Sequence, residues 1–184
     1  MSKDLDLLCD LEDVAAQASH FYQRSFTAKD PAVIAAAQTA SDQFRLAVRH
    51  PVTQRTNLRF TLDGNRTRYL RLPVVNPQGV TVSIAGNPVH VRGISTSGMI
   101  ELATTSPDRL GAVTVTVETS GWETIPPTIQ AVVTTQAVIT LGQVPGVQQI
   151  SLGGAQVTYG STSSTGVSQT WADAVATYAL GGRA

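Results

Sequence analysis

The stretch VTVTVETSGWETIPPTIQAVVTTQAVITLG, residues 113–142, changes from one periodicity to another and so decides the fold class. In its first part, Val113, Val115 and Val117 alternate with polar residues, which is the pattern of a strand with one buried face. In its second part, a proline pair opens a segment with apolar residues at helical spacing, and Gly142 stands where the helix is expected to end. The apolar positions of that helix are Ile129, Val132, Val133, Ala137 and Leu141. Strand and helix signals in one stretch predict an α+β fold.

Upstream of this stretch, alternating apolar and polar residues predict a small antiparallel β-sheet. The alternation recurs in residues 58–62, 70–72, 80–84, 89–91 and 100–102. Asp63 and Gly64 supply a turn that predicts a hairpin between the first two of these strands. Residues 85–88 supply a second turn before Val89. We expect the helix that begins at the proline pair to pack on this sheet as its cover.

The first fifty residues predict two helices. Leu5, Leu8, Leu11, Ala15 and Ala18 recur at helical spacing. With Ser2 as a possible N-cap, they predict a first helix that ends between Phe21 and Arg24. Asp30 followed by Pro31 predicts the start of a second helix, because proline suits the first helical position. The apolar stripe of this second helix is Val33, Ala37, Ala40, Phe44 and Val48, and His50 with Pro51 ends it.

The C-terminal part is richer in Gly, Gln and Ser. It predicts a weak pair of strands over residues 150–152 and 157–159, and residues 160–166 read as a flexible linker. Residues 168–180 predict a short amphipathic helix with Trp171, Val175 and Tyr178 on one stripe. The expected organisation is a main domain over residues 1–145 and an extended C-terminal arm over residues 146–184.

The composition favours a subunit of an assembly. Apolar residues make up 42% of the 184 residues, but charged residues make up 14%, where about 25% is usual. A surface poor in charge can be buried against partners without leaving ions unpaired, although secreted all-β proteins share this composition. With 13 basic and 13 acidic residues the formal net charge is zero, so the chain lacks the basic footprint of a dedicated nucleic-acid binder.

No constellation of residues predicts an enzyme, a metal site or a cofactor. Cys9 is the single cysteine, which excludes an intrachain disulfide, and its neighbours indicate a small core residue. His20, His50 and His90 are dispersed, and no phosphate-binding glycine loop occurs. The chain also lacks an apolar run of membrane-spanning length and a signal peptide, so we expect it to fold in a cytoplasm without membrane contact.

Several weak motifs follow one another in a definite order. They are Arg49–Pro51 after the two helices, Arg68–Pro73 leading through Val75 to the strand Val80–Ile84, Gly121–Trp122 before the helix opening Ile125–Ile129, and ISLGGAQVTY at 150–159. Over residues 28–160 this order resembles the head-to-tail connector (adaptor) family of long-tailed bacteriophages. The family usually has an acidic residue where this chain has Thr128.

The resemblance implies a non-enzymatic virion protein, made in the host cytoplasm and located in the neck between capsid and tail. It implies a homo-oligomeric ring of about twelve copies that contacts the portal protein and the stopper or tail-completion protein. Double-stranded DNA would pass through the ring without sequence-specific contacts, which a neutral chain suits.

The C-terminal arm is the predicted interface with the portal or a neighbouring subunit. Large aromatic rings are enriched at the centres of interfaces, and a helix as short as 168–180 is marginal alone, so we expect it to become ordered on docking. Packing of this helix on its own domain is the alternative. The predicted interface residues are Trp171, Val175, Tyr178, Leu180, Ile150, Leu152 and Tyr159.

Two other classes of protein remain open. A head-closure, tail-terminator or tail-completion protein of the same kind of virion would be dominated by a β-barrel, whereas this chain begins with two predicted helices. A β-rich carbohydrate-binding or adhesion module would fit the threonine-rich strands but would present a platform of exposed aromatic residues. The chain has ten aromatic residues in all, which disfavours such a platform.

Overall fold

The computed structural model of the chain describes residues 6–142, 149–152, 155–158 and 168–180. Its contacts divide the chain into two compact units. The helical unit comprises Met1–Ala47 and Pro126–Thr177, and the β unit comprises Val48–Ile125 and Tyr178–Ala184. The division predicted from the sequence, 1–145 and 146–184, is a different one. Its boundary lies within residues 143–148, outside the described residues, and it stays a prediction.

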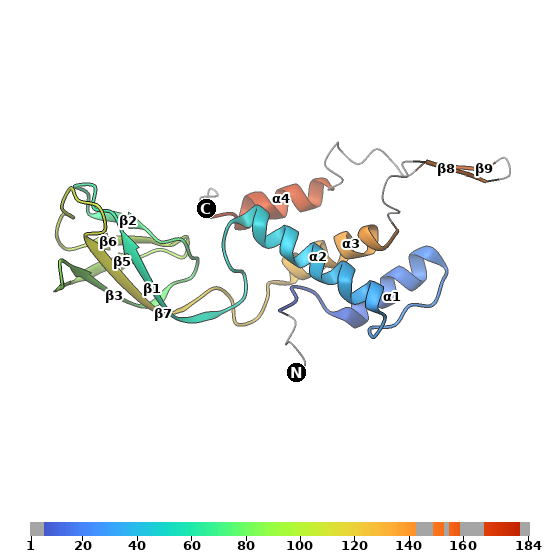
Figure 1. Cartoon of the computed structure of the whole chain (residues 1–184), viewed down its shortest axis with the longest axis horizontal. Coiled ribbons are helices and arrows are strands. Elements are labelled where there is room, and N and C mark those ends of the chain that lie inside the picture. Colours follow the sequence, from blue (N-terminus) through green and yellow to red (C-terminus); the bar gives the residue numbers. More distant parts are fainter. Residues whose placement is uncertain (1–5, 143–148, 153–154, 159–167, 181–184) are drawn as a thin grey trace. The chain divides into compact units, whose positions relative to one another are not determined.

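The helical unit contains α1 (Leu11–Tyr22), α2 (Pro31–Val48) and α3 (Pro127–Gly142), together with α4 (Gln169–Tyr178) up to Thr177. These helices and the antiparallel strands confirm the α+β class (Figure 1). The predicted extent of α3 is also confirmed. It contacts α1 inside the helical unit. From the sequence we had expected it to pack on the sheet. The buried residues of α3 are Ile129, Val132, Val133, Thr134, Gln136, Ala137 and Val138.

The first helix begins later than the leucine spacing predicts. It starts at Leu11, and the carboxylate of Asp10 caps it by accepting a hydrogen bond from the amide of Glu12 at 2.8 Å. The expectation of a helix already running through Leu8 is therefore wrong. Leu8 is buried in a non-helical segment, and its amide donates to the hydroxyl of Ser41 on α2. The expected cap, Ser2, lies outside the described residues.

The second helix follows the sequence closely. It begins at Pro31, and the predicted apolar stripe from Val33 to Val48 is fully buried, which confirms the spacing argument. Asp30 acts just before the helix: its carboxylate accepts from the amide of Thr27 at 2.7 Å, and its carbonyl accepts from the amide of Ile34. The acidic residue thus fixes the turn into the helix.

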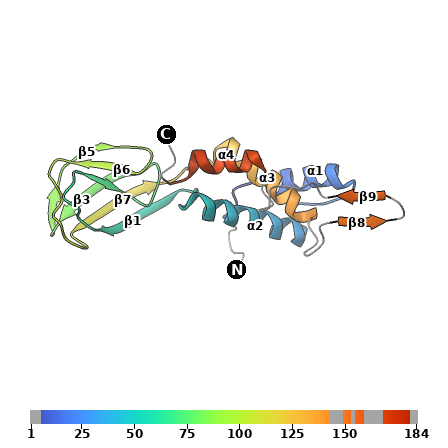
Figure 2. The same ribbon diagram turned by 90° about the horizontal axis from the view of Figure 1, so that it is seen from above.

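The β unit is built from two antiparallel sheets. One has the strand order β1-β7-β3-β4 and the other β2-β6-β5. The strands are β1 (Arg55–Leu62), β2 (Tyr69–Arg71), β3 (Gln78–Ile84), β4 (Asn87–Val89), β5 (Val91–Ile94), β6 (Met99–Leu102) and β7 (Val113–Ser120). Figure 2 shows β5 and β6 in one layer and β1, β3 and β7 in the other. Apolar residues of both sheets and of the segment that follows β2 form one core: Leu70, Leu72, Val74, Val82, Ile100, Leu102, Val113, Val115 and Val117.

The expected hairpin between residues 58–62 and 70–72 is wrong, although both strands exist. β1 pairs with β7, and β2 pairs with β6 in the other sheet. Asp63 and Gly64 contact a later loop: the Asp63 carboxylate accepts from the amide of Gly111 at 2.7 Å, and the Gly64 amide donates to the carbonyl of Arg109 at 2.9 Å. These long-range hydrogen bonds direct β2 away from β1.

The second predicted turn is confirmed. Ala85 and Gly86 take left-handed conformations, with φ of 49° and 85°, and join β3 to β4 as a two-residue hairpin. Asn87 and Pro88, which the sequence placed in the turn, already belong to β4.

The weak strand pair and the terminal helix are confirmed as well. β8 (Gln149–Leu152) pairs antiparallel with β9 (Ala155–Thr158), and α4 covers most of the predicted segment. Tyr159 and the predicted linker 160–166 lie outside the described residues. Within the described part of the chain, no helix is long and apolar enough to cross a membrane.

Candidate interaction surfaces

The terminal helix α4 packs within the chain through Trp171. This side chain is 5% exposed, and its ring meets the ring of Phe44 on α2 edge to face. The helix is capped by Ser168, whose hydroxyl accepts from the amide of Trp171 at 3.2 Å and whose carbonyl accepts from the amide of Ala172. The ring of Trp171 therefore packs against α2 within the same chain. Its role at an interface with another subunit stays a prediction.

Tyr178, the last residue of α4, belongs to an aromatic cluster of the β unit with His50 and Trp122. The Tyr178 and Trp122 rings meet edge to face with centroids 5.7 Å apart, and the His50 ring lies 5.9 Å from that of Trp122. The Nε2 atom of His50 lies 2.7 Å from the carbonyl oxygen of Tyr178, and Nδ1 lies 2.8 Å from that of Pro51. Since a carbonyl oxygen only accepts, a neutral imidazole donates to one of them and an imidazolium to both.

The other predicted interface residues near the C-terminus keep part of their surface accessible. Val175 on α4 is half-buried, as is Leu180, whose amide donates to the carbonyl of Val48 at 2.9 Å. Together with Tyr178 they are partly available for contact. The structure brings Tyr178 and Leu180 into the β unit and leaves Trp171 in the helical unit.

Ile150 and Leu152, predicted from the same arm, lie in the β8–β9 hairpin. The register pairs Ile150 with Val157 and Leu152 with Ala155, whereas the intervening pairs are Gln149–Thr158 and Ser151–Gln156. Tyr159, the remaining predicted residue, lies outside the described residues.

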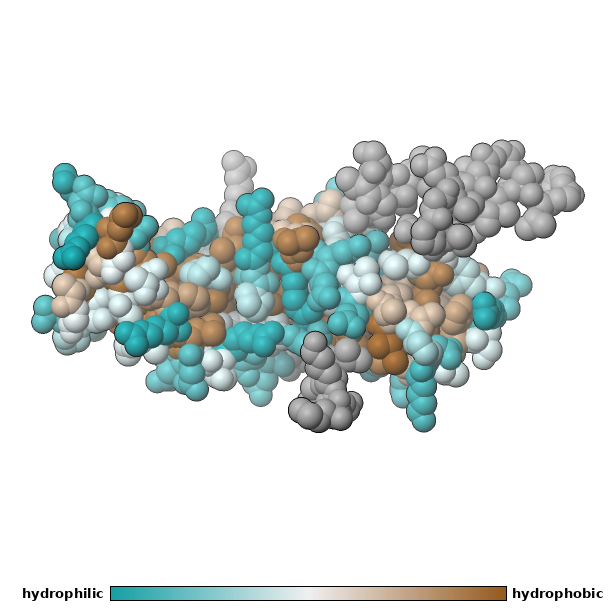
Figure 3. Space-filling model, in the orientation of Figure 1, coloured by the Kyte–Doolittle hydropathy of each residue, from teal (hydrophilic) through white to brown (hydrophobic). Residues whose placement is uncertain are grey.

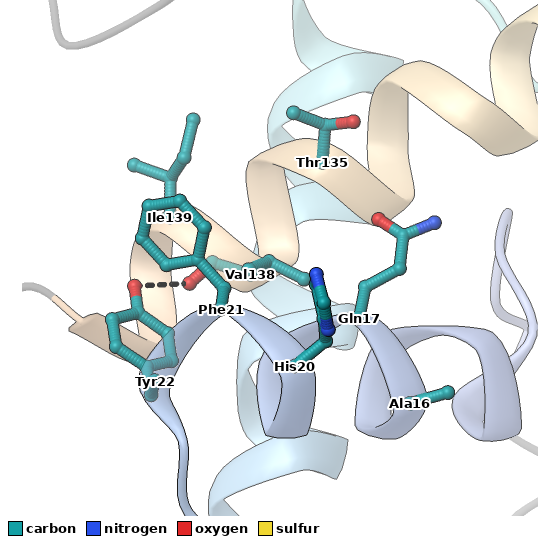
Figure 4. Close-up of a pocket in the computed structure, with 8 residues that line it drawn as sticks. All are labelled: Ala16, Gln17, His20, Phe21, Tyr22, Thr135, Val138 and Ile139. Carbon is teal, nitrogen blue, oxygen red and sulfur yellow. Dashed lines mark hydrogen bonds between the residues drawn. The ribbon is translucent and has the colours of Figure 1, made fainter.

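A groove between α1 and α3 is a further surface, which was not predicted from the sequence. It encloses about 640 Å³ and is lined by Ala16, Gln17, His20, Phe21, Tyr22, Thr135, Val138 and Ile139. Figure 4 shows Gln17, His20 and Phe21 projecting from α1 and Thr135 and Ile139 projecting from α3. The hydroxyl of Tyr22 donates to the carbonyl of Val138 at 2.9 Å and ties the two helices together at this end.

Phe21 is the most exposed aromatic residue of the groove, with 73% of its surface accessible. From the sequence, Phe21 marked the end of the first predicted helix and had no other predicted role. The sequence did carry a signal for the α3 side of the groove. From Thr124 to Ala172 it contains no Asp, Glu, Lys, Arg or His, and this run includes all of α3, β8 and β9. The space-filling view shows residues of intermediate hydropathy, drawn white, on both units (Figure 3).

Cys9 is buried, and burial, followed by the charges of Asp10 and Asp13, raises the pKa of its thiol from 9.0 to about 11, against opposing hydrogen bonds. A thiol with so high a pKa is a poor nucleophile at neutral pH. Among the residues that the structure describes, no three His, Cys, Asp or Glu side chains gather as metal ligands.

No protein-family model and no curated protein matches the chain. Among solved structures, it is similar to a chain from the neck of a native GTA particle determined with C12 symmetry, at 17% identity and a TM-score of 0.45, over 73% of this chain and 81% of that one. It is also similar to a chain from the neck of an empty GTA particle determined with C6 symmetry, at 17% identity and a TM-score of 0.46, over 72% and 81%. Similarity at this level assigns neither a family nor a function.

Proposed function

We propose that this protein is a structural subunit of the neck of a tailed phage or phage-like particle, where copies of it form a ring between the portal and the stopper or tail. The ring joins capsid to tail and serves as a conduit for DNA. In this role the chain performs no catalysis and requires no cofactor or metal.

The order of its elements is the observation that carries the proposal. The connector resemblance rests on two helices, a β region, a helix opened by a proline pair and a short strand pair. The structure places α1 and α2, the β unit, α3 from Pro127, and β8–β9 in that order. The chain thus has the elements on which the resemblance depends.

The distribution of charge supports the same proposal. The uncharged run from Thr124 to Ala172 includes exposed positions on α3, such as Thr128, Gln130 and Thr135. The solvent-exposed surface of a soluble protein normally carries charged residues, whereas the centre of a protein interface is depleted of them. An uncharged helix with exposed positions therefore suits a subunit that is packed against other subunits.

In this proposal the C-terminal arm contributes to contacts with the portal or a neighbouring copy. Val175, Tyr178 and Leu180 supply partly accessible apolar surface, and Ile150 and Leu152 lie in the hairpin. Trp171 is buried and contributes indirectly, because its contact with Phe44 holds α4 against α2.

Native mass spectrometry of the purified chain, alone and mixed with the portal protein encoded in the same genome, tests the proposal. We expect a closed ring, of about twelve copies by resemblance to the connectors, either alone or on the portal. A carbohydrate array run in parallel tests the adhesion alternative. A stable monomer that binds no portal, with or without affinity for a sugar, would overturn the proposal.

A further inference from the structure

The groove between α1 and α3 presents apolar side chains on the surface of the helical unit. Phe21 at the end of α1 is 73% exposed, and Val138 and Ile139 line the α3 side of the groove (Figure 4). Contact between apolar side chains and water is unfavourable, and it is relieved when an apolar group of a partner fills the hollow. The groove therefore suits an apolar side chain that protrudes from another molecule.

Leu110 is a side chain of this kind in the β unit. It is 81% exposed, the largest exposed fraction among the large apolar residues that the structure describes. It lies in a loop between β6 and β7, residues 107–111, which we call the Leu110 loop. Hydrogen bonds hold the loop on both sides of Leu110. The Arg109 carbonyl accepts from the amide of Gly64 at 2.9 Å, and the Gly111 amide donates to the carboxylate of Asp63 at 2.7 Å. A loop fixed in advance loses less conformational entropy on binding.

The two units of the chain carry opposite charge. The helical unit has four basic and eight acidic residues, whereas the β unit has nine basic and five acidic residues. A contact between the helical units of two copies would bring like net charges together, whereas a contact between a helical unit and a β unit brings opposite ones together. Charge therefore favours Leu110 as the occupant over Leu46, which is 80% exposed on α2 of the helical unit.

A cation stands next to the exposed leucine. Arg109 precedes Leu110 and is exposed. The preceding residue, Asp108, is paired with Arg66 at 3.0 Å. Within the part of the chain that the structure describes, Arg109 forms no ion pair. Its guanidinium is therefore available to a carboxylate of another chain.

Two carboxylates stand next to the groove. Glu12 and Asp13 are exposed on α1, and neither forms an ion pair with a described residue. They lie one helical turn, about 6 Å along the axis, before Ala16 and Gln17, which line the groove. An arginine adjacent to a docked leucine is within reach of them. Opposite charges at the rim of a contact speed association and fix the orientation of the partner.

We propose that the Leu110 loop of one copy docks in the α1–α3 groove of a neighbouring copy. Arg109 of the loop faces Glu12 and Asp13 beside that groove. The inference rests on the proposed ring function and specifies one contact within it. The loop belongs to the β unit and the groove to the helical unit, so the contact is heterologous, and repetition by rotation closes a ring.

The first experiment compares three full-length variants with the wild type by analytical ultracentrifugation, in the presence of the portal protein if the wild type assembles only on it. Leu110→Asp alters the loop, Phe21→Asp alters the groove, and Leu46→Asp is the matched control, because Leu46 is equally exposed outside the proposed contact. We expect each of the first two to raise the dissociation constant at least about tenfold, as loss of an interface hot spot does. The control should assemble like the wild type, and circular dichroism should show all four chains folded.

The second experiment reverses the charges. Arg109→Glu and Glu12→Arg should each raise the dissociation constant about two- to fivefold, as loss of an exposed ion pair does. A chain that carries both substitutions should recover most of the affinity, because the pair is restored with its signs exchanged. Arg92→Glu, at an exposed position of the same unit, is the control and should have a smaller effect than Arg109→Glu. If the double variant assembles no better than the single ones, the proposed contact is overturned.

The third experiment locates the contact by photocrosslinking. One chain of natural isotopic composition carries p-benzoylphenylalanine in place of Leu110, and the other is wild type labelled with nitrogen-15. After mixing, irradiation and digestion with trypsin, we expect the light peptide that begins at residue 110 to be joined to the heavy peptide 4–24, which contains all of α1. The same amino acid in place of Leu46 is the control and should not label that peptide.

The outcomes separate this inference from the proposed function. A ring that survives Leu110→Asp and Phe21→Asp, or whose photoproduct lacks peptide 4–24, overturns the inference and leaves the ring intact. Equal loss of assembly in the Leu46→Asp control also overturns it. Photoproducts that join only light peptides show docking within one chain and reject the neighbouring copy. A wild type that forms no ring, with or without portal, overturns both.

Discussion

The Trp171 ring meets the Phe44 ring edge to face, with centroids 5.3 Å apart and planes at 88° to each other. Phe44 is fully buried and Trp171 nearly so. One contact thus fixes the last helix of the chain to the second, across more than 120 residues of sequence.

Substitution of Trp171 by Ala should lower the free energy of unfolding of the helical unit by about 3–5 kcal/mol. The loss combines burial of a large ring with the cavity left beside Phe44. Chemical denaturation followed by far-UV circular dichroism measures it. Thr170→Ala, at an exposed position of the same helix, is the control and should change the stability by less than about 0.5 kcal/mol. Equal midpoints for the two variants would show that α4 contributes nothing to the stability of the unit.

The thiol of Cys9 should resist alkylation by iodoacetamide at neutral pH until the protein unfolds. Its pKa of about 11 leaves almost no thiolate, and burial blocks access. An exposed reference thiol, introduced as Ala16→Cys, should react readily under the same conditions. Rapid labelling of the native wild type would contradict the buried position.

The same pKa shift makes stability depend on alkaline pH. Because the folded state holds the proton more tightly than the unfolded state, whose thiol has a pKa near 9.0, the contribution of Cys9 is complete below pH 9. It is lost as the pH rises through about 11. The difference in unfolding free energy between wild type and Cys9→Ala should therefore fall over this interval. A constant difference between pH 8 and 11 would exclude the shift.

Gly64→Ala should destabilise the β unit by about 1–3 kcal/mol, because a Cβ atom at residue 64 would clash with the backbone carbonyl of Pro107. Gly93→Ala is the matched control, since a Cβ there meets Glu101 at 3.9 Å, an ordinary contact. Thermal unfolding of the two variants compares them. If both unfold at the same temperature, the loop around Pro107 does not pack on Gly64 in solution.

His50→Phe should weaken the attachment of residues 178–180 to the β unit. It keeps an aromatic ring beside Trp122 but removes the ring nitrogens that face the carbonyls of Pro51 and Tyr178, at a cost of about 1–3 kcal/mol. Hydrogen exchange at the amide of Leu180, which is bonded to Val48, should become faster. His90→Phe, at an exposed position, should leave that exchange unchanged.

The elements themselves could be predicted from local sequence signals. Periodicity placed α2, α3, α4 and most of the strands, because apolar spacing and proline positions act over a few residues. The strand expected at residues 89–91 was wrong, since β4 ends at Val89 and β5 begins at Val91 in the other sheet. The pairing of β1 with β7 was missed because Asp63 and Gly64 have the composition of a hairpin turn. Their actual partners, Gly111 and Arg109, lie more than 40 residues away and leave no mark in the local pattern.

The candidate surfaces were predicted less completely for the same reason. Trp171, Val175 and Tyr178 were found as a stripe, but which of them is buried depends on Phe44 and Trp122. The α1–α3 groove arises where Phe21 meets the end of a helix more than 100 residues later. Spacing within one helix cannot reveal a groove formed by two.

The division of the chain has a consequence for its synthesis. The segment that builds most of the β unit, Val48–Ile125, interrupts the helical unit, whose first two helices therefore emerge long before α3. At a synthesis rate of about 5–20 residues per second, roughly 4–16 s pass between the synthesis of α2 and the start of α3. During that interval Phe44, on the apolar stripe of α2, lacks the Trp171 ring that packs on it. We therefore expect the helical unit to complete its core only after α3 and α4 have been made, and a chain truncated after residue 125 to stay dependent on chaperones.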